Sequence, residues 1–244
     1  MNILVVNDDG IRSPGIVKLA QAAARFGTVT VAAPDAQCSA MSQHIHVYDP
    51  IEVSPAAFPA EGVRAWRIGG TPADCVKAAV HYLCTGEDAP DVVFSGINDG
   101  WNAGFDDLYS GTIGAAMEGL RFGIPAFAFS ASGGSDFSAA DRYLQPIIEE
   151  LLSYPRCLDV VWSVNFPDGD ADGVKGIRRG VKPAQTQFYT DRFLRTDRPD
   201  GSFVLQPASE LVCSAEPGSD VDWILRGYIT IGKVRSTVIG TDLP

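Results

Sequence analysis

Short apolar segments alternate with helix-forming segments through the first two thirds of the chain, and this alternation limits the fold more than any other feature. Apolar runs predict strands at residues 3–7, 28–33, 63–68, 92–94, 126–130 and 160–164. Between them, apolar residues at helical spacing predict helices that begin near residues 14, 72, 112 and 137. This alternation favours a doubly wound α/β fold, with a mostly parallel sheet between two layers of helices.

Two helix starts and a later change of rhythm predict the organisation of the chain. Ser13-Pro14 and Thr71-Pro72 each place a hydroxyl cap before a proline at the first helical position. After about residue 166 the chain becomes rich in Gly, Pro, Asp and Arg, with short strand-like pieces and a late strand at 228–234. We therefore predict a Rossmann-like α/β core over residues 1–166. Residues 167–244 are predicted as a β-rich extension or arm that is not an independent domain.

Charge, hydropathy and cysteine usage exclude several classes of protein. The formal net charge is −11, whereas binding to duplex nucleic acid relies on Lys and Arg to neutralise phosphates. No apolar run approaches the roughly 18 residues of a membrane span, and Ile3–Val6 is interpreted as a core strand rather than part of a signal peptide. Five cysteines without a C-x-x-C pair indicate free thiols in a reducing compartment. We expect a cytoplasmic protein without a zinc site, a membrane span or a duplex nucleic-acid partner.

Asp8 and Asp9 directly follow the first predicted strand, at the edge where open α/β sheets bind their ligands. Two adjacent carboxylates repel each other unless a cation joins them or one is protonated. Gly10 permits a sharp turn that would bring both to one ion. Carboxylate oxygens suit Mg²⁺, Mn²⁺ or Ca²⁺. A solvated acidic turn without a ligand is the other interpretation of this motif.

A segment rich in Gly, Asn and Asp follows the predicted strand at 92–94 and is predicted to be a loop from Ser95 to Gly111. Its glycines allow backbone amides to approach a ligand closely. Asn98 and Asn102 offer neutral oxygen ligands or amide donors. A surface loop is the simpler alternative, but a loop of this length at a strand end is more often functional.

Ser110-Gly111-Thr112 mark the start of the next helix. Ser110 is predicted to cap it, and residues 111–113 are expected to present free amides that form an anion site. An ordinary capped helix is the alternative.

Ser39 and a histidine pair follow the second predicted strand. Ser39 offers a hydroxyl ligand, although a loop serine is more often only a turn residue. His44 and His46 are expected on one face of a half-exposed strand, without a third nitrogen or sulfur ligand.

Together these motifs resemble the SurE family (survival protein E) of 5'/3'-nucleotidases. The resemblance covers nearly the whole chain. It rests on Val6-Asn7-Asp8-Asp9-Gly10, Gly70-Thr71-Pro72-Ala73-Asp74-Cys75-Val76, Ser95-Gly96-Ile97-Asn98 continuing through Gly104, Tyr109-Ser110-Gly111-Thr112, and the later Gly218-Ser219-Asp220 and Gly227-Tyr228-Ile229-Thr230-Ile231.

The resemblance implies a divalent-metal phosphomonoesterase that hydrolyses nucleoside 5'/3'-monophosphates to nucleoside and phosphate, with short polyphosphate as a further substrate. It implies one metal ion per subunit, Mg²⁺ or Mn²⁺, which would polarise a phosphoryl oxygen and activate water. It also implies homodimers or homotetramers that exchange C-terminal elements, which suits an arm at 167–244. The implied residues are Asp8, Asp9, Ser39 and Asn98 for the metal, Asp8 and Asp9 for catalysis, and Asn102, Ser110, Gly111 and Thr112 for phosphate.

One segment departs from the family pattern and keeps other functions open. Ala36-Gln37-Cys38-Ser39-Ala40 stands where the family usually has Arg-Asn-x-Ser-Gly. The missing arginine weakens the hold on an anionic substrate, and Ala40 lacks the backbone freedom of glycine. This departure is the best support for a nucleotide-binding or metal-sensing protein with little turnover. An aspartyl-phosphate phosphatase with Asp8 as nucleophile is a second alternative, although the adjacent acids lack D-x-D spacing.

Overall fold

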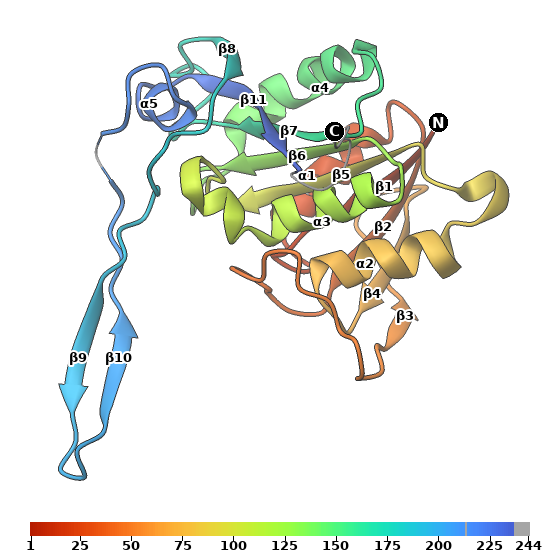
Figure 1. Cartoon of the computed structure of the whole chain (residues 1–244). Coiled ribbons are helices and arrows are strands. Elements are labelled where there is room, and N and C mark those ends of the chain that lie inside the picture. The colour runs from red at the N-terminus through yellow and green to blue at the C-terminus, as the bar shows by residue number, and fades with distance from the viewer. Residues whose placement is uncertain (213, 237–244) are drawn as a thin grey trace, which may run out of the picture.

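The computed structural model describes residues 1–212 and 214–236. Within them, nine strands form one sheet in the order β3-β4-β2-β1-β5-β6-β7-β11-β8, and β9 pairs with β10 in a separate hairpin (Figure 1). The elements are β1 (Asn2–Val6), α1 (Pro14–Ala23), β2 (Thr28–Pro34), β3 (Val53–Pro55), β4 (Arg64–Ile68), α2 (Pro72–Ala78), η1 (Ala79–Leu83), η2 (Gly86–Asp88), β5 (Val92–Asp99), η3 (Gly104–Leu108), α3 (Gly111–Arg121), β6 (Ala126–Ala131), α4 (Ser138–Ser153), β7 (Val160–Asn165), β8 (Ile177–Val181), β9 (Phe193–Asp197), β10 (Phe203–Pro207), α5 (Asp220–Leu225) and β11 (Ile229–Arg235).

The centre of the sheet is parallel, which confirms the doubly wound α/β prediction. β1 pairs with β2 and β5, and β5, β6 and β7 continue the parallel order. β3 joins β4 and β11 joins β7 in the antiparallel sense. The carboxyl ends of the parallel strands therefore meet along one edge, where a site is expected.

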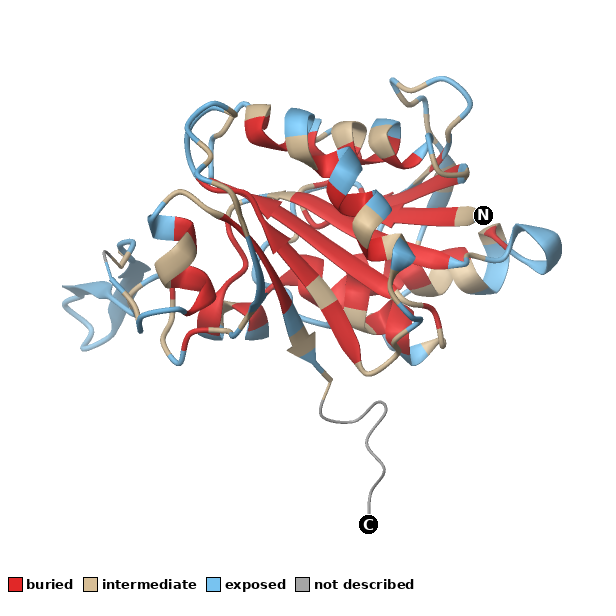
Figure 2. Ribbon diagram, turned by 90° about the horizontal axis from the view of Figure 1, so that it is seen from above, coloured by how far each residue is buried: buried red, intermediate tan, exposed pale blue. Residues whose placement is uncertain are grey.

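Two layers of helices bury the two faces of the sheet. α1 and α4 cover one face with the first hydrophobic cluster, and α2 and α3 cover the other with the second. Successive residues of β1 divide between the layers: Ile3 and Val5 belong to the first cluster, Leu4 to the second. The central strands are buried over most of their length (Figure 2). Each fully buried Val, Leu or Ile side chain contributes roughly 1.5–3 kcal/mol.

Helix starts agree with the sequence signals, whereas several element boundaries differ. The Ser13 hydroxyl accepts a hydrogen bond from Ile16 N–H at the start of α1. Thr71 forms a capping box with Asp74 at the start of α2. The predicted helix over 72–84 ends as α2 at Ala78 and continues as the π-helical turn η1. The sequence pattern did not reveal the short edge strand β3.

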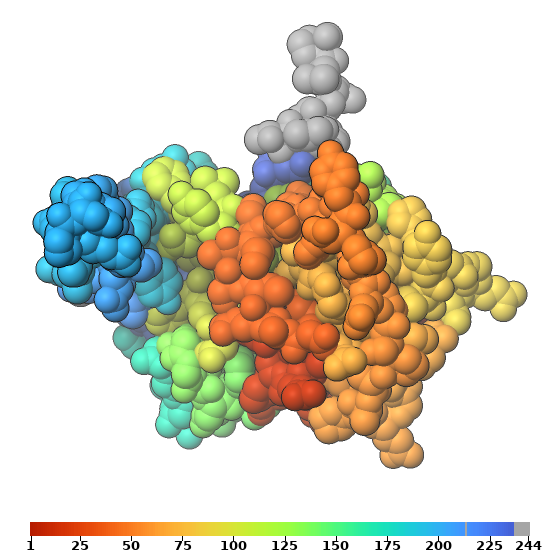
Figure 3. All heavy atoms as spheres, turned by 90° about the horizontal axis from the view of Figure 1, so that it is seen from below, coloured from red at the N-terminus to blue at the C-terminus, as the bar shows by residue number. Residues whose placement is uncertain are grey.

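The C-terminal part of the chain adds to the same sheet and then leaves the body. β11, which confirms the predicted late strand, pairs with β7 and β8. The β9–β10 hairpin projects away from the sheet, and Figures 1 and 3 show it at one side of the molecule. The domain boundary after residue 166 stays a prediction. Residues 213 and 237–244 of the predicted arm lie outside the described residues.

The described cysteines, Cys38, Cys75, Cys84 and Cys157, form no disulfide, and Cys213 falls outside this set. No helix in the described part of the chain has both the length and the apolar character that a membrane crossing requires.

Candidate active site

Asp8 is buried at the carboxyl end of β1 and held by the start of α3. Only 3% of the surface of Asp8 is exposed to solvent. The Thr112 hydroxyl donates to Asp8 Oδ1 at 2.6 Å, and the Thr112 N–H donates to Oδ2 at 3.2 Å. The start of α3 approaches Asp8 so closely that position 111 requires glycine. A Cβ atom there would lie 2.9 Å from both Cβ and Oδ2 of Asp8.

The environment of Asp8 disfavours its ionised form in the absence of a cation. Burial raises the pKa of Asp8 to about 6; the hydrogen bond from Thr112 opposes this rise, and the charge of Asp9 adds to it. Burial also raises the pKa of Asp9. A cation at this edge would stabilise both carboxylates by replacing the lost water and reducing their repulsion.

Asp9 and Asn98 lie at the ends of the neighbouring strands β1 and β5. Asp9 Oδ2 accepts a hydrogen bond from Asp99 N–H at 2.9 Å. Asn98 Nδ2 donates to Gly100 O at 2.7 Å, which leaves Asn98 Oδ1 as an acceptor without a described donor. The loop predicted from Ser95 is wrong at its start, because β5 continues to Asp99. Pairing with β6, with an irregularity after Ser95, keeps this segment in the sheet.

Asn102 is anchored by two residues that the sequence motifs did not reveal. Asn165 Oδ1 accepts from Asn102 N–H at 3.0 Å, and Asn165 Nδ2 donates to Asn102 O at 2.8 Å. Asn102 Nδ2 donates to Ser130 Oγ at 2.8 Å. Asn165 is the last residue of β7, and Ser130, its partner in the sheet register, is the last but one of β6. A polar residue near the end of an apolar strand was the available signal.

The amides at the start of α3 are mostly engaged, so the expectation of three free amides over residues 111–113 is wrong. Ser110 caps the helix as predicted, and its Oγ accepts from Ile113 N–H at 3.0 Å. Thr112 N–H is used by Asp8. The sequence predicted the Ser110 cap, but it did not show that the Asp8 carboxylate would accept a hydrogen bond from the Thr112 amide. Gly111 N–H and the Ser110 hydroxyl proton remain available to a ligand.

The loop after β2 lies across the start of α3, and Cys38, the residue before Ser39, contacts Asp8. Cys38 N–H donates to Asp8 O at 2.7 Å. Ser39 follows it and is exposed, and Ser42 N–H donates to Tyr109 O at 2.8 Å. Ala40 adopts a left-handed φ of 58°, a conformation that costs an alanine about 1–2 kcal/mol. The chain thus keeps a backbone conformation suited to the family's glycine.

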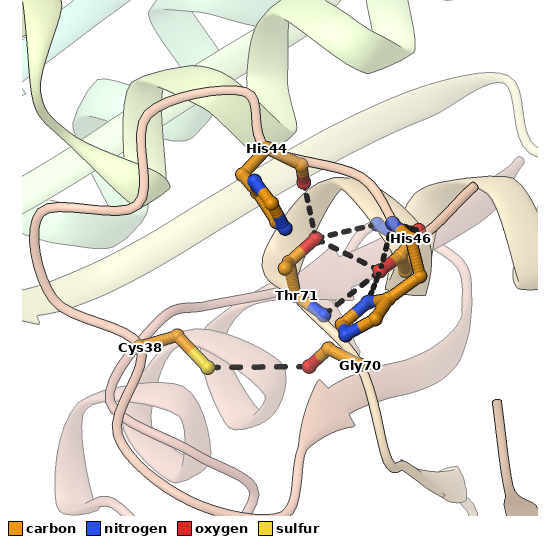
Figure 4. A network of polar contacts seen from close by, with 6 residues as sticks. Cys38, His44, His46, Gly70 and Thr71 are labelled. Carbon is orange, nitrogen blue, oxygen red and sulfur yellow. Dashed lines mark hydrogen bonds and ion pairs between the residues drawn. The ribbon is translucent and has the colours of Figure 1, made fainter. Parts of the chain in front are cut away.

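Polar contacts fasten this loop to the start of α2 (Figure 4). The buried Asp74 carboxylate accepts from His46 N–H at 3.2 Å and lies 2.6 Å from His46 Nδ1. The Thr71 hydroxyl donates to His44 O at 2.5 Å, and Cys38 Sγ lies 3.9 Å from Gly70 O. The predicted strand at the histidines is wrong: His44 and His46 lie in irregular loop, held by side chains rather than by a neighbouring strand.

Cysteine chemistry is disfavoured at this edge. Burial raises the pKa of Cys38, and the charges of Asp8 and Asp74 raise it further, so the thiol keeps its proton at neutral pH. A thiol in this state is a weak nucleophile.

The donor set suits a hard cation rather than zinc. Among residues 1–212 and 214–236, no three His, Cys, Asp or Glu side chains gather so as to hold a metal ion. A cation at the end of β1 would therefore rely on Asp8 and Asp9 with neutral oxygens and water, the ligands that Mg²⁺ and Mn²⁺ accept.

Comparisons with known proteins agree with the resemblance. The family model "Survival protein SurE" matches residues 3–190. The "5'-nucleotidase SurE" of Clostridium botulinum (strain Loch Maree / Type A3) is 37% identical over 235 residues, which cover 95% of this chain and 91% of that protein. The corresponding protein of the Langeland strain is 36% identical over the same shares. The crystal structure of SurE protein from Aquifex aeolicus matches with a TM-score of 0.82 and 32% identity, covering 98% of this chain and 95% of that one.

Proposed function

The chain belongs to the SurE family, and from this premise we propose that it is a phosphomonoesterase that hydrolyses nucleoside monophosphates to nucleoside and phosphate. The observation that carries the proposal is the buried Asp8, held by Thr112 beside Asp9 at the carboxyl edge of the sheet. Relatives that are 36–37% identical over 95% of the chain carry the name 5'-nucleotidase. Both 5'- and 3'-monophosphates are included, and short polyphosphate is a further candidate.

We propose one divalent metal ion per subunit, Mg²⁺ or Mn²⁺. Asp8, Asp9, Ser39 and Asn98 would hold it. The raised pKa of Asp8 and the unpaired Asn98 Oδ1 fit such a ligand set. When bound, the ion supplies charge neutralisation at the phosphoryl group and acidifies water.

The residues of the chain have separate tasks in this proposal. Thr112 orients Asp8 through two hydrogen bonds. Gly111 N–H and the Ser110 hydroxyl donate to phosphoryl oxygens as negative charge develops there. Asn102, fixed by Asn165 and Ser130, presents its remaining amide hydrogen to the same group. Asp9, the more accessible of the two acids, accepts the proton of the attacking water.

A phosphate-release panel tests the proposal. Purified full-length protein is assayed with nucleoside 5'- and 3'-monophosphates in Mg²⁺, in Mn²⁺ and after chelation. We expect metal-dependent release from at least one nucleotide. Tight nucleotide binding without release under all metals would favour the binding or sensing function instead. Trapping of an acyl-phosphate on Asp8 would favour the aspartyl-phosphate mechanism.

Replacement of Asn165 by alanine is expected to lower kcat about 10- to 100-fold with a small change in KM. Asn102 loses both bonds to its backbone, and a displacement of about 1 Å in a positioned group can cost 10²-fold. Asn2→Ala is the matched control: its side-chain amide also makes two bonds, to Glu87 O and Ala89 O, far from the site. Equal kinetics for the Asn165 and Asn2 variants would remove Asn165 from the positioning machinery.

We further propose that the β9–β10 hairpin mediates a homodimer or homotetramer. All ten residues of its two strands are exposed. The register places Phe193, Phe203 and Leu205 on one face of the hairpin, together with Arg195 and Asp197. An isolated two-stranded hairpin is marginally stable in water, and exposed apolar patches mark interaction sites. The exchange of C-terminal elements inferred for the family fits this segment.

Leu205→Glu is expected to shift the protein to smaller species in light scattering coupled to gel filtration, because a charge would be buried in the apolar contact. Thr196→Glu, on the opposite face of the same hairpin, is the control and should leave the mass unchanged. An unchanged mass for Leu205→Glu would argue against this interface.

Free thiols at the four described cysteines fit a reducing compartment, and we propose the cytoplasm.

A further inference from the structure

A small cavity lies where strands β7, β8 and β11 of the sheet meet η3 and the start of α5. The volume open to the centre of a water molecule inside it is about 10 Å³. Its polar lining residues are Asp107, Ser163, Asn165, Asp220, Thr230 and Lys233, whose ammonium group lies over the Trp162 ring. A volume of roughly 10–15 Å³ on this measure accommodates one water molecule.

Two of these side chains have a buried atom without a hydrogen bond in the described part of the chain. They are Asp107 Oδ1 and Thr230 Oγ1. Asp107 is 8% exposed and Thr230 is 1% exposed, so bulk water does not compensate them. An unsatisfied buried polar group destabilises the fold, and such groups in folded proteins generally have a partner.

The other polar groups around the cavity are already used. Asp220 accepts from the N–H groups of Gly104, Ala184 and Val221. Asn165 is bonded to Asn102 through both of its amide atoms. The Ser163 oxygen accepts from Asn165 Nδ2 at 3.4 Å, which leaves its hydroxyl proton free. The groups that need a partner are therefore Asp107, Thr230 and the Ser163 proton.

We propose that this cavity binds one water molecule, which bridges Asp107 and Thr230 and accepts from Ser163. Three bonds match the usual number for a buried water. The water joins η3, β7 and β11, the elements that attach the C-terminal segment to the sheet. Asn165 lines the same cavity and holds Asn102, so the site also supports the loop of the candidate active site.

The charges around the cavity favour neutral water over a monovalent cation. Burial raises the pKa of Asp107 well above its ordinary value, and the charges of Asp220 and Asp106 raise it further. Both effects favour the neutral carboxyl, which needs no counterion. The oxygens of Asp220 face backbone N–H groups, which weakens them as cation ligands.

The sign of a stability change tests the proposal. Thr230→Val removes the hydroxyl with little change in shape. If a water depends on that hydroxyl, the unfolding midpoint should fall by about 3–6 °C. If the hydroxyl has no partner, its removal leaves the midpoint unchanged or raises it, and that result overturns the proposal. Ser95→Ala is the control, because Ser95 Oγ is also buried and unpaired but does not line this cavity. Its midpoint should not fall.

A high-resolution crystal structure of the full chain, grown in a potassium salt and again in a rubidium salt, identifies the ligand directly. We expect one peak within hydrogen-bonding distance of Asp107 and Thr230, without anomalous signal from rubidium. An anomalous peak would assign a cation and overturn the proposal, and so would the absence of any peak. Neither experiment depends on nucleotidase activity.

Discussion

Asp8→Asn is expected to abolish nucleotide hydrolysis and, at the same time, to stabilise the metal-free protein at neutral pH. The variant removes one of the two negative charges proposed to hold the metal, and the loss in kcat should be roughly 10³-fold or more. The fold should persist, because asparagine has the shape of aspartate. The Thr112 hydroxyl can also turn from donor to acceptor, so that the new amide keeps both contacts to Thr112.

The stability gain follows from the raised pKa. The pKa of Asp8 in the folded, metal-free protein is about 6, against an ordinary value of 3.8. The folded protein therefore holds this proton more tightly than the unfolded chain does. The stability contributed by this tighter proton binding is fully present below pH 3.8 and is lost as the pH rises through about 6. The difference between these two pKa values corresponds to roughly 3 kcal/mol of stability at pH 7.5, and asparagine avoids this loss.

Chemical unfolding of the metal-free proteins at pH 5 and pH 7.5, beside the phosphate-release assay, measures both effects. Asp35→Asn is the control: Asp35 is an exposed acid after β2, paired with Arg67 at 3.0 Å, and its variant should keep activity and stability. An Asp8→Asn protein that retains activity would reject the catalytic role. One that loses activity together with stability would make Asp8 a structural residue.

The fold and the location of the site follow from local patterns that the structure keeps. β1 is apolar from Ile3 to its last residue, Val6, and polar Asn7 follows it, so Asp8 and Asp9 had to emerge at the carboxyl edge of a parallel sheet. Ser110 and Thr71 are caps whose signal lies within four residues of sequence. These features depend on neighbours in the chain, and a single sequence contains them.

Features that depend on distant partners could not be predicted in this way. Asn102, which follows β5, and Asn165, at the end of β7, are 63 residues apart in sequence and meet only because β5, β6 and β7 are adjacent in the sheet. The engagement of Thr112 by Asp8 spans 104 residues. His46 looked like a strand residue, yet its contacts to Asp74 hold it in a loop. Pairing with β6 extends β5 through a glycine and asparagine stretch that local propensity assigns to a loop.

Gly114→Ala is expected to reduce activity about 100-fold. In a helix interior, glycine to alanine normally stabilises by about 1 kcal/mol. Here the Cβ would lie 2.1 Å from Ser42 O and 2.5 Å from Ser42 C, so the backbone of the loop after β2 must withdraw by about 1 Å. Ser42 is bonded to Tyr109 O, and Ser39 lies three residues before it. Withdrawal of the loop therefore displaces Ser39, a proposed metal ligand. A displacement of this size lowers kcat even if alanine stabilises the helix.

Gly119→Ala, in the same helix, separates a displaced loop from a disturbed core. Its Cβ would meet Val93 Cγ2 at 2.8 Å, on the sheet side of α3 and away from the loop. Overpacking there should cost about 1–3 kcal/mol and leave kcat nearly unchanged. The two variants are thus expected to differ in activity, which is lost in Gly114→Ala and kept in Gly119→Ala, although the unfolding midpoint falls in Gly119→Ala. Metal titration should show weaker binding in Gly114→Ala alone. Equal metal affinity in both variants would mean that the loop carrying Ser39 does not contribute to the metal site.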